Sequence, residues 1–313
     1  MSLENNTAPV PVNEHNTAIA VAYKNPGYIA DDVLPRADVD FENFTYLEYP
    51  VAETFSVTDD MVGRRSPPNE VEWTATEKPG MTEDHGLDEP VPSKDTANAR
   101  RGADPLAKST ERLSEVIALN REIRTAWLVF NAANYPVGYK ETLVGTDQFS
   151  DFANSDPLDV INTALDVPLM RPNIMVVGQE VWTKLKQHPD IIKSIHGNSG
   201  DKGNATRRAV AELFELEDVL VGQSRVNTAV KGQTAVLNRI WGKHMSLIYR
   251  NRLADSQGGI SWGLTFQWGT PIATDRFDPD IGMRGGTRNR VGESLVEKII
   301  AAQAGYFIEN AVA

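Results

Sequence analysis

One amphipathic stretch of unusual length limits the folds open to this chain. Between Pro105 and Asn134, apolar residues recur at steps of three and four, which predicts one face of a single helix. Those residues are Leu106, Leu113, Val116, Ile117, Ile123, Trp127 and Phe130. The opposite face is predicted to be charged, with Lys108, Glu111, Arg112, Glu115, Glu122 and Arg124. Pro136 forbids continuation. About 28 residues make a rod of roughly 40 Å, which is long for a globular helix.

A strand–glycine–helix unit follows this rod and raises the question of a nucleotide site. Ile174–Val177 is strand-like, Gly178 turns the chain, and Glu180–Gln187 is helical with Pro189 beyond it. A dinucleotide turn needs several glycines, and a glutamate in the first helical turn takes the place of an anion. We therefore interpret the unit as structural. Its predicted core residues are Ile174, Val176, Val181, Trp182 and Leu185.

Further helices and strands alternate along the rest of the chain, which indicates an α+β fold. The predicted helices are Asp156–Leu165, capped by Ser155 or Asp156, and Thr206–Phe214. The predicted strands are Val219–Val221, a pair around Gly242, Ile260–Thr270 and a last one from Tyr306. Residues 194–206 and 278–290 are predicted loops.

The first 92 residues have a different character. Prolines interrupt residues 1–40, which predicts an irregular arm that gains structure by lying on something else. Residues 41–92 hold two strand candidates, one within Phe41–Met61 and one at Val71–Thr76, the second bounded by prolines. A two-stranded ribbon is marginally stable by itself, so this segment points to assembly.

Composition excludes several chemistries. The 313 residues contain no cysteine, so thiolate metal sites and cysteine nucleophiles are excluded. The five histidines have no metal-ligand spacing, and no serine lies in a nucleophile-elbow frame. The net charge of -12 disfavours a protein that wraps nucleic acid. No apolar run is long enough to span a membrane, and the N-terminus does not look like a signal peptide. We expect no enzyme, cofactor or metal.

The order of these segments resembles the major capsid proteins of tailed double-stranded DNA bacteriophages, the Hong Kong 97-like fold that encapsulin shells share. The stretches that carry the resemblance are VFNAANYP, FSDFANSDP, VVGQEVWTKLKQHPD, ELFELEDVLVGQSRVNTA, RIWGKHMSLIYR and RVGESLVEKIIAAQAGYFIENAV. The resemblance covers nearly the whole chain. It implies an N-terminal arm (1–40), an extended loop (41–92), a peripheral domain with a spine helix (93–150 and 284–313) and an axial domain (151–283).

The same resemblance implies a function and partners. The expected function is an icosahedral head shell around phage DNA, built from hexamers and pentamers, without sequence-specific DNA contact and without a membrane. A portal protein is an expected partner, and scaffolding is expected to come from a separate protein or to be dispensed with. The sequence leaves open whether a decoration protein also binds. The expected locations are the virion and, during assembly, the host cytoplasm. Covalent crosslinking is not predicted. An encapsulin-like compartment and a soluble α/β enzyme remain alternatives.

Charged residues in loops are the candidates for contacts between subunits. In the extended loop these are the pairs Arg64-Arg65 and Glu83-Asp84. His196 belongs to the glycine-rich loop Ile195–Asn204, which is expected near a symmetry axis. Arg284 and Arg288 lie among glycines and threonines, where they could meet a neighbouring subunit's acids or a phosphate backbone.

Overall fold

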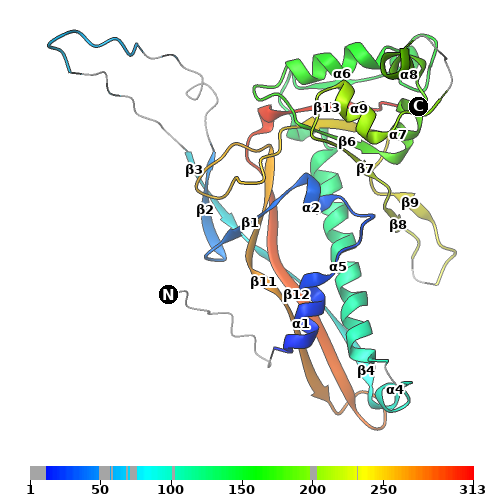
Figure 1. Ribbon diagram of the computed structural model, residues 1–313. Helices are drawn as coiled ribbons and strands as arrows, with labels where there is room; N and C mark the ends of the chain where they lie inside the picture. Colours follow the sequence, from blue (N-terminus) through cyan, green and yellow to red (C-terminus); the bar gives the residue numbers. More distant parts are fainter. Residues whose placement is uncertain are drawn as a thin grey trace.

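The computed structural model describes residues 12–48, 57, 59–67, 70, 76–100, 103–197, 203–230 and 232–313. Two sheets lie at different levels of an elongated molecule, and a long helix runs beside them (Figure 1). That helix, α5, spans Pro105–Val129. Asp104 caps it by accepting from the amides of Leu106 and Ala107, and Pro105 occupies its first turn, where a missing N–H costs nothing. The predicted rod is confirmed.

The four-stranded sheet has the order β1-β11-β12-β4 and runs along the lower part of the molecule. Its strands are β1 (Arg36–Val39), β11 (Gly263–Asp278), β12 (Gly286–Ile299) and β4 (Glu83–Pro92). β11 and β12 form a long antiparallel hairpin with a register shift between Trp268 and Ile272. Helix α5 packs on β12 and β4, and short α4 (Ser93–Ala97) follows β4.

The five-stranded sheet has the order β5-β13-β10-β6-β7 and forms the upper part with its helices. Its strands are β5 (Lys140–Thr142), β13 (Gly305–Glu309), β10 (Met245–Ile248), β6 (Ile174–Gly178) and β7 (Asp218–Gly222). Its helices are α6 (Pro157–Asp166), α7 (Gln179–Leu185), α8 (Pro189–His196) and α9 (Arg207–Leu213). The largest apolar core lies between this sheet and these helices.

The predicted strand–glycine–helix unit is β6 and α7, and its five predicted core residues are all buried. Gly178 turns the chain with an ordinary φ of -69°. A Cβ there would lie 1.9 Å from the Gly242 carbonyl oxygen and 2.8 Å from that of Trp241. The glycine is therefore required by close approach of a neighbouring backbone rather than by a ligand.

The N-terminal segment is more regular than predicted. Helix α1 (Glu14–Ala22) packs on β11 and α5, and α2 (Ala30–Val33) leads into β1. The expectation of an irregular segment over 1–40 is wrong for its described part. Its prolines fall between the elements, so they delimit structure there without interrupting a helix.

The extended loop contains a ribbon of β2 (Asn43–Glu48) and β3 (Thr76–Met81) that leads away from the body (Figure 1). The predicted second strand, Val71–Thr76, lies outside the described residues except at its last position. β3 passes through Pro79-Gly80, which was expected to end a strand, because an edge strand tolerates a proline without a ladder N–H. The rings of Phe44 and Tyr46 pack on Phe266 of β11 and anchor the base of the ribbon.

Three predictions about the bounds or pairing of elements are wrong. The two strands near Gly242 do not pair with each other, because β9 (Leu237–Arg239) pairs with β8 (Arg225–Asn227) and β10 lies in the large sheet. The loop predicted at 278–290 already contains the start of β12. Helix α8 includes residues 194–196 of the other predicted loop. Three short 3-10 helices complete the described chain, Ala132–Asn134, Gly145–Asp147 and Ala302–Ala304.

The faces of α5 also differ from the prediction. Leu113 and Ile117 are buried, but Val116 and Trp127 are 43% and 72% exposed. Glu122, predicted on the charged outer face, is fully buried. The described helices include none that is both long and apolar enough to cross a bilayer.

Gly178→Ala should destabilise the unassembled chain by about 2–3 kcal/mol, because the new methyl group overlaps a backbone carbonyl that cannot rotate away. Gly203→Ala is the matched control, since its Cβ would meet only Ile192 at 3.8 Å. Urea unfolding measures both, and equal free energies of unfolding would contradict this account.

Candidate interaction surfaces

Helix α5 holds the N-terminal segment through charged side chains. Glu115 accepts hydrogen bonds from the Tyr28 hydroxyl at 2.7 Å, from Asn25 Nδ2 at 2.9 Å and from the Tyr23 hydroxyl. Burial, together with its hydrogen bond to the Glu115 carboxylate and the negative charge there, raises the pKa of Tyr23 to about 12. Three residues upstream of α2 are thus fixed to one carboxylate.

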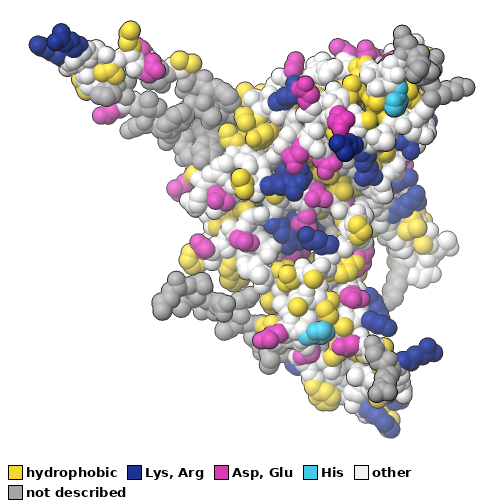
Figure 2. Space-filling view, in the orientation of Figure 1, with side chains coloured by type: hydrophobic (Ala, Val, Ile, Leu, Met, Phe, Trp, Pro, Cys, Tyr) yellow, Lys and Arg dark blue, Asp and Glu magenta, His cyan; other side chains and the backbone are white. Residues whose placement is uncertain are grey.

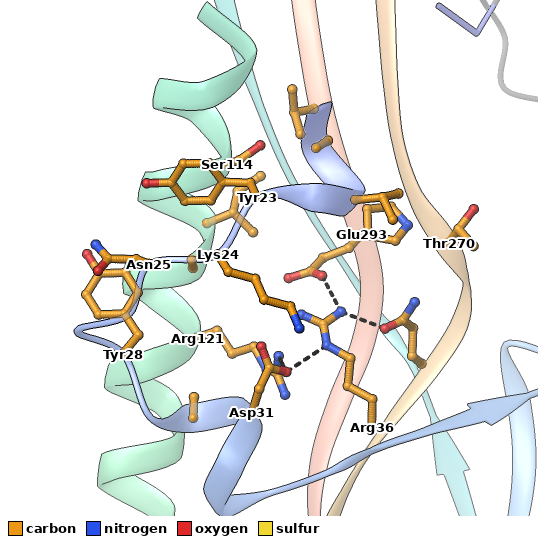
Figure 3. Close-up of a pocket in the computed structure, with 18 of the residues that line it drawn as sticks. Tyr23, Lys24, Asn25, Tyr28, Asp31, Arg36, Ser114, Arg121, Thr270 and Glu293 are labelled. Carbon is orange, nitrogen blue, oxygen red and sulfur yellow. Dashed lines mark hydrogen bonds and ion pairs between the residues drawn. The ribbon is translucent and has the colours of Figure 1, made fainter. Parts of the chain in front are cut away.

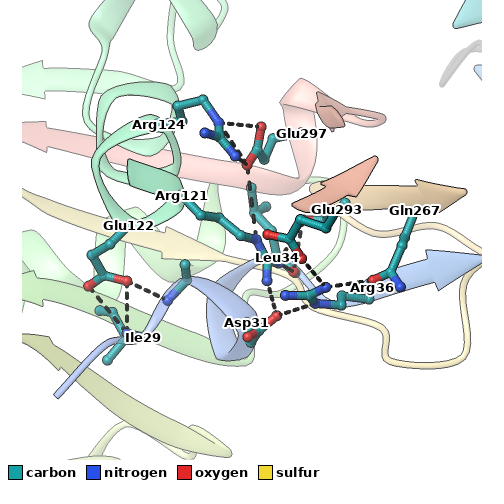
Figure 4. Close-up of polar contacts among 12 residues, drawn as sticks. Ile29, Asp31, Leu34, Arg36, Arg121, Glu122, Arg124, Gln267, Glu293 and Glu297 are labelled. Atoms are coloured by element: carbon teal, nitrogen blue, oxygen red, sulfur yellow. Dashed lines mark hydrogen bonds and ion pairs between the residues drawn. The ribbon is translucent and has the colours of Figure 1, made fainter. Parts of the chain in front are cut away.

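Two turns further along the helix, Glu122 is a fully buried carboxylate with four donors. Figure 4 shows its hydrogen bonds to the N-terminal segment at Ile29. The backbone amides of Ile29 and Ala30 donate to it at 3.0 and 2.8 Å. Trp241 Nε1 donates at 2.5 Å and Ser224 Oγ at 3.1 Å. Burial raises the pKa of this carboxyl, and the donors oppose the rise. Glu122 therefore joins the start of α2, helix α5 and the base of the β8–β9 hairpin.

The neighbouring Arg121 points to the other side and is only 2% exposed. Its guanidinium is paired with Asp31 and donates to Thr265 Oγ1 at 3.1 Å. Arg36 continues the chain of charges, with its guanidinium 2.8 Å from Asp31 and 2.9 Å from Glu293. Burial alone would raise the pKa of Asp31, but the two guanidinium groups outweigh it and lower that pKa. We call Glu115, Arg121 and Glu122 with their partners the polar clamp.

The polar clamp borders a groove of about 980 Å³ between the N-terminal segment, α5 and the β11–β12 hairpin (Figure 3). Both cations and carboxylates line the groove, including Lys24, Asp31, Arg36, Arg121 and Glu293. Most of these charges are already paired with one another. The groove is therefore part of how the segment is held rather than a preformed site for a small ion.

Sequence reasoning missed the polar clamp because charges on a helix ordinarily face water. One signal was available. Residues at steps of four along α5 form one buried row, and a charged residue lies within it. The row consists of Leu113, Ile117, Arg121, Thr125 and Val129. A charge within an apolar row predicts a buried, paired side chain.

The predicted contact residues of the extended loop lie in two different places. Arg64 and Arg65 are exposed in the outlying part of the loop. Glu83 and Asp84 are not near them but begin β4, where they pair in register with Leu295 and Ser294. The Asp84 carboxylate also accepts from the Ser294 hydroxyl. Both acids remain exposed at the sheet edge.

The other three predicted residues also separate. His196 is the exposed last residue of α8. Arg284 is exposed in the turn between β11 and β12. Arg288 lies within β12, where its guanidinium donates to Asp278 at 2.8 and 3.0 Å. Arg288 is thus engaged inside its own subunit, whereas Arg284 is presented outward.

Ser155, His188 and Asp190 together look like a hydrolase triad but are arranged as structure. His188 is fully buried, and its Nδ1 accepts from the Asp190 amide at 3.3 Å, which caps α8. Its Nε2 must then carry the proton that faces Ser155 Oγ at 3.1 Å, so it cannot act as the base for that hydroxyl. Within the described ranges, no group of three or more metal-ligand side chains is present either.

Glu122→Gln should destabilise the unassembled chain by about 2–4 kcal/mol, because an amide nitrogen would face a donor and leave both unsatisfied in the interior. Glu111→Gln is the control on the same helix, where the side chain is exposed. Urea unfolding of both variants compares them, and a near-neutral Glu122→Gln would refute the proposed role of this carboxylate.

The lowered pKa of Asp31 predicts how the polar clamp depends on pH. An ionised, paired aspartate stabilises the fold above its unfolded pKa of about 3.9, and this contribution is lost as pH falls through the lower folded pKa. Asp31→Asn should therefore be less stable than the parent near pH 7, and the two melting temperatures should converge on acidification. A difference that stays constant from pH 7 down to pH 2 would contradict this.

Comparison with known proteins gives this architecture a family. No family model matches the chain. The major capsid protein of Pseudomonas phage JBD67 is 49% identical over 306 residues, which cover 98% of this chain and 99% of that protein. The major capsid protein of Burkholderia phage BcepMu is 28% identical over 242 residues, or 74% of each.

Among solved structures, the crystal structure of a phage-related protein from Bordetella bronchiseptica superposes with a TM-score of 0.78 at 21% identity, covering 97% of this chain and 99% of that one. The predicted Hong Kong 97-like α+β fold is thereby confirmed. The chain belongs to the family of phage major capsid proteins, the structural proteins of the head shell.

Proposed function

We propose that copies of this chain form hexamers and pentamers, and that these close into an icosahedral shell around packaged double-stranded DNA. The observation that carries the proposal is the 49% sequence identity to a phage major capsid protein, which extends along almost the whole chain. The extended loop supports it. Only the base of its ribbon packs on its own core, through Phe44 and Tyr46, and the described residues beyond the ribbon project away from the body (Figure 1).

The outlying part of the extended loop has the composition of an interface. Val57 and Met61 are 98% and 83% exposed, and Arg64 and Arg65 lie beside them. Apolar side chains of that exposure favour burial against a partner, and the arginines can fix its register. We propose that this part of the loop lies across a neighbouring copy. His196 and the end of α8 would then face a symmetry axis.

The proposed domains follow the two sheets. The five-stranded sheet with α6–α9 is the proposed axial domain, and the four-stranded sheet with α5 the peripheral domain. Among the strands of the predicted peripheral and axial ranges, which divide at residues 151 and 283, three join the sheet of the other domain. β5 and β13, from the predicted peripheral ranges, belong to the five-stranded sheet, while β11, from the predicted axial range, belongs to the four-stranded sheet. We propose boundaries that follow these pairings.

Several partners belong to the proposal. A chain of net charge -12 suits a container that holds DNA without gripping it, so no sequence-specific contact is proposed. A portal protein, a separate scaffolding protein and a decoration protein would complete the head. Assembly would take place in the host cytoplasm before the shell becomes part of the virion.

Electron microscopy and sedimentation of the purified full chain test the proposal. We expect the chain to form closed shells, either by itself or together with its scaffolding protein. A stable monomer at micromolar concentration that forms no shell even with the scaffold would refute it. Recovery of an enzyme cargo, with no phage DNA or portal, would instead indicate a compartment of the encapsulin kind.

The loop makes a separate prediction. Replacing Val57 and Met61 by serine should leave the unfolding of the unassembled chain unchanged, because neither side chain packs on its own subunit. Burial of two such side chains is worth roughly 3 kcal/mol, so the concentration needed for shells should rise at least tenfold. Light scattering against concentration measures this, and an unchanged threshold would exclude the outlying loop from the interface.

A further inference from the structure

The turn between β11 and β12, at the lower end of the molecule, combines exposed apolar and basic side chains. Phe277 and Met283 are 64% and 97% exposed, and Arg276 and Arg284 are exposed beside them. Segment 93–100 joins this end, since the Ser93 amide donates to the Gly285 carbonyl oxygen at 3.1 Å. We call this surface the basic tip, made of Lys94, Arg100, Arg276, Phe277, Met283 and Arg284.

The basic tip has a net positive charge in an acidic protein. The exposed carboxylates in the same segments are Asp95 and Asp280, against four exposed cations. Two further carboxylates near this surface are already paired, because Asp278 binds Arg288 and Asp88 binds Arg290. Dark-blue side chains gather at this lower end of the molecule in Figure 2.

A second surface, at the base of the extended loop, has the opposite charge. Phe41 and Met81 are 72% and 54% exposed there. The backbone holds their segments together, since the Thr82 amide donates to the Glu42 carbonyl oxygen at 3.0 Å. We call this surface the acidic base, made of Phe41 and Met81 with the exposed acids Asp38, Asp40, Glu42, Glu77, Glu83 and Asp84. The nearby cations Lys78 and Arg36 are already paired, with Glu48 and with Asp31 and Glu293.

These two surfaces cannot meet within one subunit. Val39, two residues before Phe41, pairs with Trp268, and β11 continues from there to Asp278 before the turn begins. At about 3.3 Å per residue, the turn lies on the order of 25 Å or more from Phe41. A contact between the basic tip and the acidic base therefore joins two copies of the chain.

We propose that the basic tip of one copy docks on the acidic base of another, with Met283 and Phe277 against Phe41 and Met81. The proposal rests on the shell assembly proposed above. Copies that each carry a charge of -12 repel one another, so a stable contact between them needs local opposite charge. Because the two surfaces differ, the contact is head-to-tail and can continue from copy to copy.

The absence of cysteine allows a direct test by disulfide trapping. Met283→Cys is combined with Phe41→Cys or with Met81→Cys in the full chain, and shells are assembled and oxidised. A disulfide needs Cα atoms within about 7 Å, so bridging inside one subunit is excluded. We expect a ladder of covalent oligomers on non-reducing gels from at least one pair, and none from Met283→Cys combined with Leu253→Cys, at another exposed position.

Several results would overturn the contact. Shells that assemble but give no ladder with either pair would do so. A covalent dimer from Met283→Cys alone would show that tips meet tips. If the parent chain forms no shells, the proposed function itself fails, which is a different result from shells without the crosslink.

Charge reversal gives an independent test. Arg276→Glu with Arg284→Glu should raise the assembly threshold at least tenfold, and adding Asp40→Lys with Glu42→Lys should restore it to within about threefold of the parent. Arg207→Glu with Arg225→Glu, also exposed, changes the net charge equally and should have a much smaller effect. Melting temperatures of the unassembled variants control for folding. An unchanged threshold in the tip variant, or no restoration by the acidic-base variant, would overturn the pairing.

Discussion

The polar clamp on α5 is the constraint on which the rest of the subunit depends. Arg121 and Glu122 are adjacent in sequence but point to different sides of the helix, and both are buried. One holds Asp31 and the other the amides at the start of α2, so the N-terminal segment is fixed to the helix between them. Removing a partner from either would leave an uncompensated charge in the interior, which costs several kcal/mol. The directional hydrogen bonds of these two side chains fix the position of the segment more specifically than apolar packing would.

This arrangement gives a shell protein a well-connected body from which several segments project toward other copies. Glu122 also binds Trp241 and Ser224, so α5, the N-terminal segment and the upper part of the subunit are coupled at one carboxylate. Around this body, the extended loop, the end of α8 and the β11–β12 turn carry exposed apolar or charged side chains. Side chains that contact copies of the chain are thus expected on projections, while the buried charges hold those projections in place.

Local patterns predicted the elements well where local physics decides them. Asp156 followed by Pro157 starts α6 as expected, and the continuous apolar run before Gly178 gives a fully buried strand. The faces of α5 could not be read in the same way. Periodicity assumes that apolar side chains point inward, but Trp127 is largely exposed and Glu122 is buried, because partners distant in sequence decide which face is covered. The same holds for Arg288, since only the pairing of the hairpin brings its partner Asp278 within hydrogen-bond reach.

By itself, the sequence determined the α+β class, the long helix, the strand–glycine–helix unit and the family resemblance, since these depend on residues near one another and on their order. Only the tertiary structure decided which charges are buried and which side chains remain for other copies. Strand pairing sets that division. β1 joins β11 across more than two hundred residues, and β11 and β12 carry their turn far from the base of the loop. Contacts at such separation leave no periodic trace in the chain, so no local pattern could have shown them.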